Sequence, residues 1–171
     1  YALVAAPMLY LLGGGTAAKL KDYVSKGGQL LCTYLTGYVD RNTLCYLGGF
    51  PGDGLSELFG LCSEEIDTLY PSDKNQVRFL DDSLGEVRDF AEVLRLKGAV
   101  PLGFYTGDFY GGSPAVTRNT YGKGSAWYTA ARLDDETMKK LFERICTSAG
   151  IPICPVPTKG EYYCRETEAV R

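Results

Sequence analysis

The sequence contains no histidine among its 171 residues. Histidine is the usual general base of active sites, the activator of serine and cysteine nucleophiles, and the commonest metal ligand. Its absence excludes a Ser-His-Asp triad and a Cys-His pair, and it argues against a metal site. We therefore expect no metal and no cofactor in this stretch of chain.

Closely spaced cysteine pairs are also absent. The six cysteines form no C-x-x-C pair, which a four-cysteine zinc site requires. Cys32 and Cys146 lie in apolar periodic segments and are predicted to be small buried side chains. Disulfides remain open, but neither a glycosylation sequon nor a secretory signal favours an oxidising compartment. We expect reduced thiols and a cytoplasmic, bacterial location.

Long apolar runs and clusters of basic residues are missing as well. No run approaches the roughly 18 residues of a membrane span, and the net charge is −3, so we expect neither a membrane nor nucleic acid as a partner. A hydrophobic content of 45% predicts one globular domain over residues 1–155. Residues 156–171 read as a linker and the start of a further domain. The chain begins within an apolar strand, so we expect it to be a piece of a longer protein.

The first apolar segments predict a βαβ unit. Residues 1–6 read as a buried strand, 16–26 as a helix with one apolar face, and 29–35 ("QLLCTYL") as a strand covered on both faces. Strand, helix and strand in this order predict a parallel sheet. A connection rich in glycine and proline follows, with a short helix around 54–60.

The second half reads as strands, a hairpin and a helix. Segments of strand-like composition predict four short strands at 64–70, 76–80, 86–96 and 99–106. Residues 114–130 predict a hairpin that turns at 121–124. Residues 135–149 form the clearest helix, with Asp134 as N-cap and Gly150 at its end.

A glycine-rich turn precedes the first helix. Gly13, Gly15 and Ala18 satisfy the G-x-G-x-x-A pattern of a dinucleotide-binding turn. In that fold the first glycine follows the strand directly, and an acidic residue ends the second strand about 20 residues further on. Here six residues separate the strand from Gly13, and Asp40 already lies in the loop. The pattern therefore favours a flexible helix start over a nucleotide site.

Other candidate catalytic groups are no stronger. The acidic neighbours at 64–65, 81–82 and 134–136 point apart on a strand and do not face each other on a helix. A hydrolytic pair of carboxylates must flank one bond at a separation of about 5 to 9 Å. Cys62 lacks both a strand-to-helix elbow and a histidine. We interpret the acids as solvated surface, apart from the cap at Asp134.

Two loops concentrate aromatic, charged and amide side chains among glycines, at 36–52 and 107–119. Aromatic and arginine-bearing loops on a rigid scaffold are typical of contact surfaces. The alternative is that Tyr38, Tyr46 and Phe109 only pack the loops onto the sheet. The residues alone favour neither interpretation.

These loops belong to segments that resemble a known family. The segments "YALVAAPMLYLL", "GGQLLCTYLTGYVDRNTLCYLGGFPG", "DFYGGSPAVTRN" and "YGKGSAWY" closely resemble the middle domain of family 42 glycoside hydrolases, the bacterial β-galactosidases. The resemblance runs with few gaps from residue 1 to about residue 155. It implies an α/β fold of flavodoxin or class I glutamine amidotransferase type, a parallel sheet flanked by helices, with an added β-hairpin region.

The resemblance also implies a role. In that family the domain follows a TIM-barrel catalytic domain, mediates trimer formation and helps to wall the active-site cleft of a neighbouring subunit. The two catalytic glutamates belong to the barrel, so no catalytic residue is implied here, and the galactoside substrate is met only indirectly. The implied partners are the barrel, a C-terminal β-domain and further copies of the same enzyme. The residues that match the family's loop motifs, and are therefore candidates for contacts, are Tyr38, Asp40, Asp108, Phe109, Tyr110, Arg118 and Asn119.

The sequence departs from this family in two places. In the family a strand, a helix and a strand normally precede the position of Tyr1, and we expect this part to be missing from the present stretch of chain. Gly13-Gly-Gly-Thr16 replaces the polar or acidic residues that the family usually has at the first helix. An alternative function is a flavodoxin-like module that binds a nucleotide or flavin at the carboxyl ends of the parallel strands. A third possible function, that of an amidotransferase-like hydrolase, is almost excluded because the sequence has no histidine.

Overall fold

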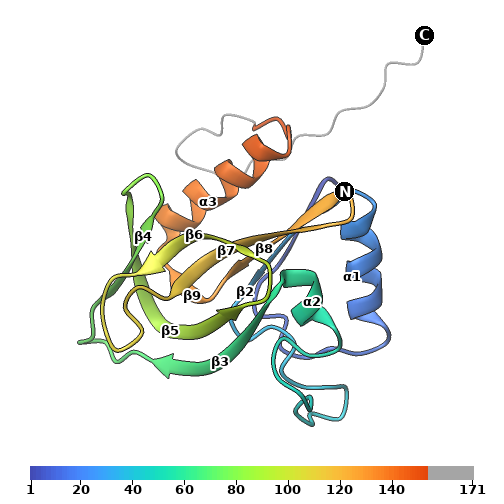
Figure 1. Ribbon diagram of the computed structural model, residues 1–171, viewed down its shortest axis with the longest axis horizontal. Helices are drawn as coiled ribbons and strands as arrows, with labels where there is room; N and C mark the ends of the chain where they lie inside the picture. The colour runs from blue at the N-terminus through green and yellow to red at the C-terminus, as the bar shows by residue number, and fades with distance from the viewer. Residues whose placement is uncertain (154–171) are drawn as a thin grey trace, which may run out of the picture.

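The computed structural model describes residues 1–153, which form three helices and nine strands in a single sheet (Figure 1). The helices are α1 (Thr16–Ser25), α2 (Leu55–Phe59) and α3 (Asp135–Ser148). The strands are β1 (Leu3–Ala6), β2 (Gln29–Thr33), β3 (Leu61–Thr68), β4 (Asn75–Phe79), β5 (Leu84–Leu96), β6 (Val100–Tyr105), β7 (Pro114–Tyr121), β8 (Gly124–Thr129) and β9 (Ala131–Leu133).

The sheet is mixed, with a parallel and an antiparallel part. Strands β1, β2 and β8 pair in parallel, and every other ladder is antiparallel along the order β1-β2-β8-β7-β6-β4-β5-β3. The predicted βαβ unit is confirmed as β1-α1-β2, and the predicted hairpin is confirmed as β7-β8. Strand β1 was expected to be buried but is only partly buried, because it lies at the edge of the sheet. The α/β class therefore holds, with the hairpin region forming the larger share of the sheet.

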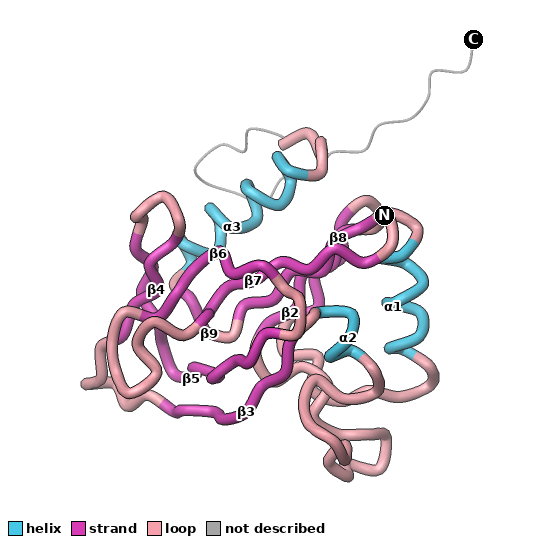
Figure 2. The backbone as a smooth tube through the Cα atoms, viewed as in Figure 1, coloured by secondary structure: helices cyan, strands magenta, loops and turns pink. Residues whose placement is uncertain are grey.

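The antiparallel part closes on itself. Val87 of β5 pairs with Asn75 of β4 on one edge and with Leu133 of β9 on the other. Strand β9 follows β8 after Ala130 alone, and the carbonyl of Ala130 accepts from the backbone N–H of Glu92 at 2.9 Å. The ladder from β8 through β7, β6 and β4 to β5 thus returns to its start, and the tube in Figure 2 follows this curl.

Two hydrophobic clusters fill the molecule. One cluster lies within the curled strands and includes Leu141 and Ile145 of α3, while the other includes Ala17 and Val24 of α1 together with α2. Figure 1 accordingly shows α3 apart from α1 and α2. Each helix buries one apolar face against the sheet, which contributes most of its stability.

The helix ends follow local chemistry. The carboxylate of Asp134 accepts from the backbone N–H of Thr137 at 3.0 Å, so the predicted N-cap of α3 is confirmed. Helix α1 instead begins after Gly15, which has a left-handed backbone and provides no side-chain cap. Gly27, with φ of 115°, follows the last turn of α1.

Some expectations differ from the structure. Strand β9 was not predicted, because three residues carry too little pattern to reveal a strand. Cys146 is only partly buried, contrary to the prediction, whereas Cys32 is buried. The predicted linker at 156–171 lies outside the described residues. None of the helices within residues 1–153 is long and apolar enough to cross a membrane.

Candidate contact surface

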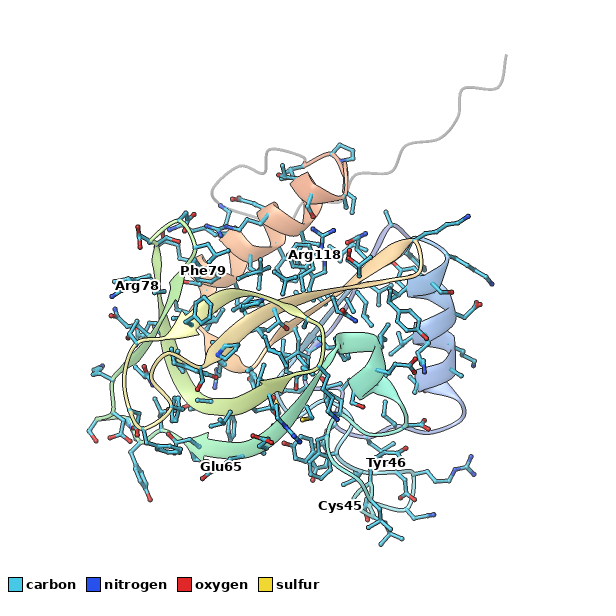
Figure 3. All side chains as sticks on the ribbon, in the orientation of Figure 1. Cys45, Tyr46, Glu65, Arg78, Phe79 and Arg118 are labelled. Atoms are coloured by element: carbon cyan, nitrogen blue, oxygen red, sulfur yellow. The ribbon has the colours of Figure 1, made fainter. Side chains whose placement is uncertain are left out.

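A loop after β2 projects from the body of the molecule. We call residues 39–49 the finger and residues 34–38 its root. Val39 forms a parallel bridge with Leu11 and an antiparallel bridge with Cys45, and its carbonyl accepts from the N–H of Leu12 at 2.9 Å. Figure 3 shows Cys45 and Tyr46 on this loop, which extends below α2. The finger is thus a small ladder that lies outside the main sheet.

Asp40 shapes the turn within the finger. Its carboxylate oxygen accepts from the backbone N–H of Asn42 at 2.8 Å and of Leu44 at 3.0 Å. Its own N–H donates to the carbonyl of Leu44 at 2.9 Å. Short acidic side chains often stabilise turns in this way. The contact candidate Asp40 therefore shapes the backbone of the turn that carries the exposed Leu44.

Large apolar side chains are exposed on the finger and on the segment beside it. Leu44 is 64% exposed and Leu47 is 99% exposed. On the adjacent segment, Met8, Tyr10 and Leu11 are 44% to 47% exposed. We call these five residues the apolar surface. Gathered apolar exposure of this kind marks interaction sites on soluble domains.

Tyr38 anchors the root of the finger. Its ring stacks on Phe50 at a centroid distance of 4.0 Å and on Tyr10 at 5.9 Å. Its hydroxyl donates to Oε1 of Glu92 at 3.3 Å and lies 3.4 Å from the hydroxyl of Ser63. Burial and then the carboxyl of Glu92 raise the pKa of Tyr38 well above its usual range. Tyr38 is therefore a neutral hydrogen-bond donor, half-buried between the finger and the sheet.

Glu92 is a functional candidate that the sequence analysis missed. Its side chain is fully buried, and its oxygens accept from the N–H of Leu35 at 2.9 Å, from Tyr38 at 3.3 Å and from the hydroxyl of Tyr128 at 2.7 Å. Burial raises the pKa of this carboxyl to about 7, although the hydrogen bonds oppose the shift. The available signal was an acid between Ala91 and Val93 in the middle of an apolar strand.

The second candidate loop divides into exposed and buried residues. Phe109 is 70% exposed, and the exposed Asp108 accepts from the N–H of Phe109 at 2.6 Å. Tyr110 is buried, stacks edge-on against Tyr105 and donates to the carboxylate of Asp67 at 2.8 Å. Tyr110 therefore holds the loop to the core, whereas Phe109 is the large side chain that the loop exposes to solvent.

Arg118 and Asn119 are consecutive on β7 and serve the sheet itself. The guanidinium of Arg118 lies over the ring of Trp127 at 5.0 Å and donates to the hydroxyl of Ser125 at 3.0 Å. Asn119 donates to the carbonyl of Leu58 at 2.8 Å, at the end of α2. Figure 3 shows Arg118 below α3, well apart from the finger. The seven candidates thus form three separate groups.

The glycine-rich turn before α1 contacts the finger. Strand β1 ends at Ala6, well before Gly13, as expected. A side chain added at Gly13 would meet Cβ of Arg41 at 3.4 Å, and the hydroxyl of Thr16 donates to the carbonyl of Gly13 at 2.6 Å. A cavity of about 340 Å³ lies instead at the amino ends of β1 and β2. The dinucleotide pattern is therefore a helix start beside the finger.

These features define an α/β domain in which loops with exposed apolar side chains project from a closed core. A family model described as the β-galactosidase trimerisation domain matches residues 1–152. The chain therefore belongs to the family of β-galactosidase trimerisation domains.

Individual relatives agree with this family. The chain is 45% identical to β-galactosidase BglY of Alicyclobacillus acidocaldarius over 157 residues, covering 88% of the chain and 23% of the relative. It is 47% identical to β-galactosidase GalA of Bacillus licheniformis over 142 residues, covering 83% and 21%. The chain thus spans less than a quarter of the length of these two relatives.

Solved structures resemble the fold closely. The β-galactosidase of Rahnella sp. R3 superposes with a TM-score of 0.86 at 37% identity, over 89% of the chain and 23% of that protein. Gan42B, a GH42 β-galactosidase of G. stearothermophilus, gives 0.83 at 42% identity, over 88% and 22%. These comparisons support the family resemblance seen in the sequence and give no support to the flavodoxin-like binding alternative.

Proposed function

We propose that this domain joins the subunits of a longer β-galactosidase through the finger and the apolar surface. The observation that carries the proposal is the exposure of Leu44 and Leu47 on a projecting ladder whose backbone is internally bonded. A preformed apolar contact loses little conformational entropy on association. The partner is a second copy of the same enzyme, because the family is that of trimerisation domains.

The longer enzyme hydrolyses terminal β-D-galactosides with retention of configuration. Two carboxylates of a TIM barrel act as nucleophile and as acid/base, and this domain contributes no catalytic residue. Its partners within the chain are that barrel and a C-terminal β-domain. We propose that Phe109 and Asp108 wall the cleft of a neighbouring subunit, and the exposure of both side chains on their loop supports this assignment.

The remaining features of the chain support a cytoplasmic protein that binds other protein subunits. The net charge of −3 opposes nucleic-acid binding. The four cysteines within residues 1–153 are free, which suits a reducing compartment. The relatives named above are bacterial enzymes.

The test is the assembly of the full-length enzyme carrying Leu44→Ser and Leu47→Ser together. Removing two apolar side chains that the contact buries should weaken the trimer by roughly a hundredfold or more, because burial of each side chain contributes about 1.5 to 3 kcal/mol. Sedimentation velocity at several protein concentrations measures this shift. The fold should be unaffected, because both side chains are exposed.

A matched control comes from the β4-β5 hairpin. Leu80 and Leu84 are 66% and 51% exposed but lie away from the finger. Their double replacement by serine should leave the trimer intact. Equal assembly of the finger variant and the wild type would exclude the finger as the subunit contact.

A further inference from the structure

A buried carboxyl group joins the root of the finger to the sheet. Oε1 of Glu92 accepts from the backbone N–H of Leu35 and the hydroxyl of Tyr38, both in the root. Oε2 accepts from Tyr128 on β8. Glu92 lies on β5, where its backbone also bonds to Ala130 and Tyr105. One side chain therefore links three parts of the fold.

No cation balances this carboxyl group among residues 1–153. Every ion pair in this range lies on other side chains. The titratable groups around Glu92 are neutral, because burial is the largest cause that shifts their pKa values and it raises each of them. These groups are Tyr38 from the root, Tyr105 from β6, Tyr128 from β8 and, beside Tyr128, Cys32 from β2. On β3 the neighbour of Tyr38 is the uncharged Ser63, and Asp67 of that strand is bound by Tyr110.

The root depends on these bonds because its backbone is strained. Leu35 has φ of 60°, a conformation that costs a branched residue of order 1 kcal/mol. Its N–H has the Glu92 carboxyl as its partner. The rest of the root is held by backbone bonds, in which the N–H of Gly37 donates to the carbonyl of Leu9 at 2.8 Å and that of Tyr38 to the carbonyl of Tyr10 at 3.0 Å. The rings of Tyr38 and Phe50 stack beside these bonds. Opening the root would expose the carboxyl to water.

We propose that Glu92 is a pH-sensitive latch, whose protonation state sets how firmly the root holds the finger against the sheet. The part of the proposal that concerns subunit assembly rests on the proposed function. The latch itself requires only this chain.

The direction of the response follows from proton linkage. In the closed root the pKa of Glu92 is about 7, against an ordinary value of 4.5, so the closed form binds a proton more tightly than an open, hydrated form. Closure is therefore firmest at acid pH. The open fraction grows by up to roughly tenfold for each pH unit between about 4.5 and 7, and it levels off above pH 7.

The test is hydrogen exchange of the 171-residue chain between pH 5 and pH 8, corrected for the intrinsic rates. Protection of the Leu35 amide and of the neighbouring root amides should fall at least tenfold from pH 5 to pH 7. In Glu92→Gln the protection should be independent of pH, because glutamine keeps the size and an acceptor but cannot ionise. The amides of Leu141 and Ile145 in α3 are the internal control.

Two further measurements keep the proposal falsifiable if Glu92→Gln folds poorly. Tyr38→Phe removes one donor and should weaken root protection while leaving its pH dependence in place. Carbon-13 titration of the Glu92 carboxyl should give a midpoint near pH 7. A midpoint below pH 5, or a pH dependence in Glu92→Gln equal to that of the wild type, would overturn the latch.

Assembly of the full-length enzyme is measured separately at pH 5.5 and pH 7.5. A trimer that weakens with rising pH in the wild type and not in Glu92→Gln supports control of the subunit contact. If the root opens with pH but assembly is constant, the assembly part is wrong and the latch stands. If root protection is constant, the latch is wrong, and the Leu44 and Leu47 variants alone decide the proposed function.

Discussion

Asn119 illustrates how a conspicuous polar residue can act entirely within the fold. Its side-chain amide donates to the carbonyl of Leu58 at 2.8 Å and lies 3.4 Å from that of Glu57. These groups belong to the last turn of α2, where carbonyls lack partners within the helix. Gly60 ends the helix with φ of 62°, and a side chain there would meet Asn119 at 2.8 Å. One amide therefore fixes α2 onto β7.

We expect Asn119→Ala to lower the free energy of unfolding by about 1 to 2 kcal/mol, because the carbonyl of Leu58 would lose its partner. Urea unfolding followed by circular dichroism measures the change. Thr120→Ala, an exposed neighbour on the same strand, is the control and should be neutral. A neutral Asn119→Ala would show that water replaces the amide and that the residue is free to serve another contact.

Elements were largely predictable because their signals are local. The helix over α3 follows from its apolar periodicity and its cap at Asp134, and the hairpin over β7-β8 follows from the Gly122–Gly124 turn. The pairing of β2 with β8, whose partners lie 96 residues apart (for example Gln29 with Ser125), carries no such signal. The closure of the sheet through β9 could not be predicted either, because it depends on how the curled sheet brings β9 next to β5.

Asp134 caps helix α3 and also connects this helix to the sheet. Its carboxylate accepts from the N–H and hydroxyl of Thr137, and from the N–H of Glu86 on β5 at 2.8 Å. Burial alone would raise the pKa of Asp134, but the bonds from Thr137 and Glu86 outweigh it, and the net pKa is lowered. The ionised form is therefore favoured in the folded protein.

We expect Asp134→Ala to lower the free energy of unfolding by about 1 to 2 kcal/mol at pH 7, through loss of the cap and of the bond to Glu86. The loss should shrink as the pH falls below 3.8, because a lowered pKa makes the ionic contribution fully present above that ordinary value and removes it progressively as the pH falls through the lower pKa of the folded protein. Thermal unfolding at pH 7 and pH 3 measures both. Asp135→Ala, in the exposed first turn, should have a smaller effect, and an equal effect would indicate helix-dipole charge as the cause.

At the scale of the whole molecule, the contact candidates are distributed in a way that the sequence could not show. Tyr38 and Asp40 lie at the finger, Asp108 and Phe109 at the loop after β6, and Arg118 on β7 beneath α3. Sequence motifs mark which residues are special to a family but do not separate contact from support. Burial makes that separation, since it leaves the apolar surface and Phe109 facing outward and turns Tyr110 to the core. Glu92, the residue that joins finger and sheet, lies in a strand that reads as ordinary core.

This separation predicts two independent functions for the two loops in the full-length enzyme. Phe109→Ala should raise KM for a galactoside by roughly three- to tenfold, the value of one lost side-chain contact of about 1 kcal/mol, while kcat and the trimer remain unchanged. The Leu44 and Leu47 variant should change assembly first. Steady-state kinetics and sedimentation on the same samples separate the effects.

The control is Tyr70, an aromatic residue that is 74% exposed on the β3-β4 loop. Its replacement by alanine should alter neither KM nor assembly. An unchanged KM in Phe109→Ala would show that the loop after β6 does not line the cleft, and the finger would then be the contact that remains.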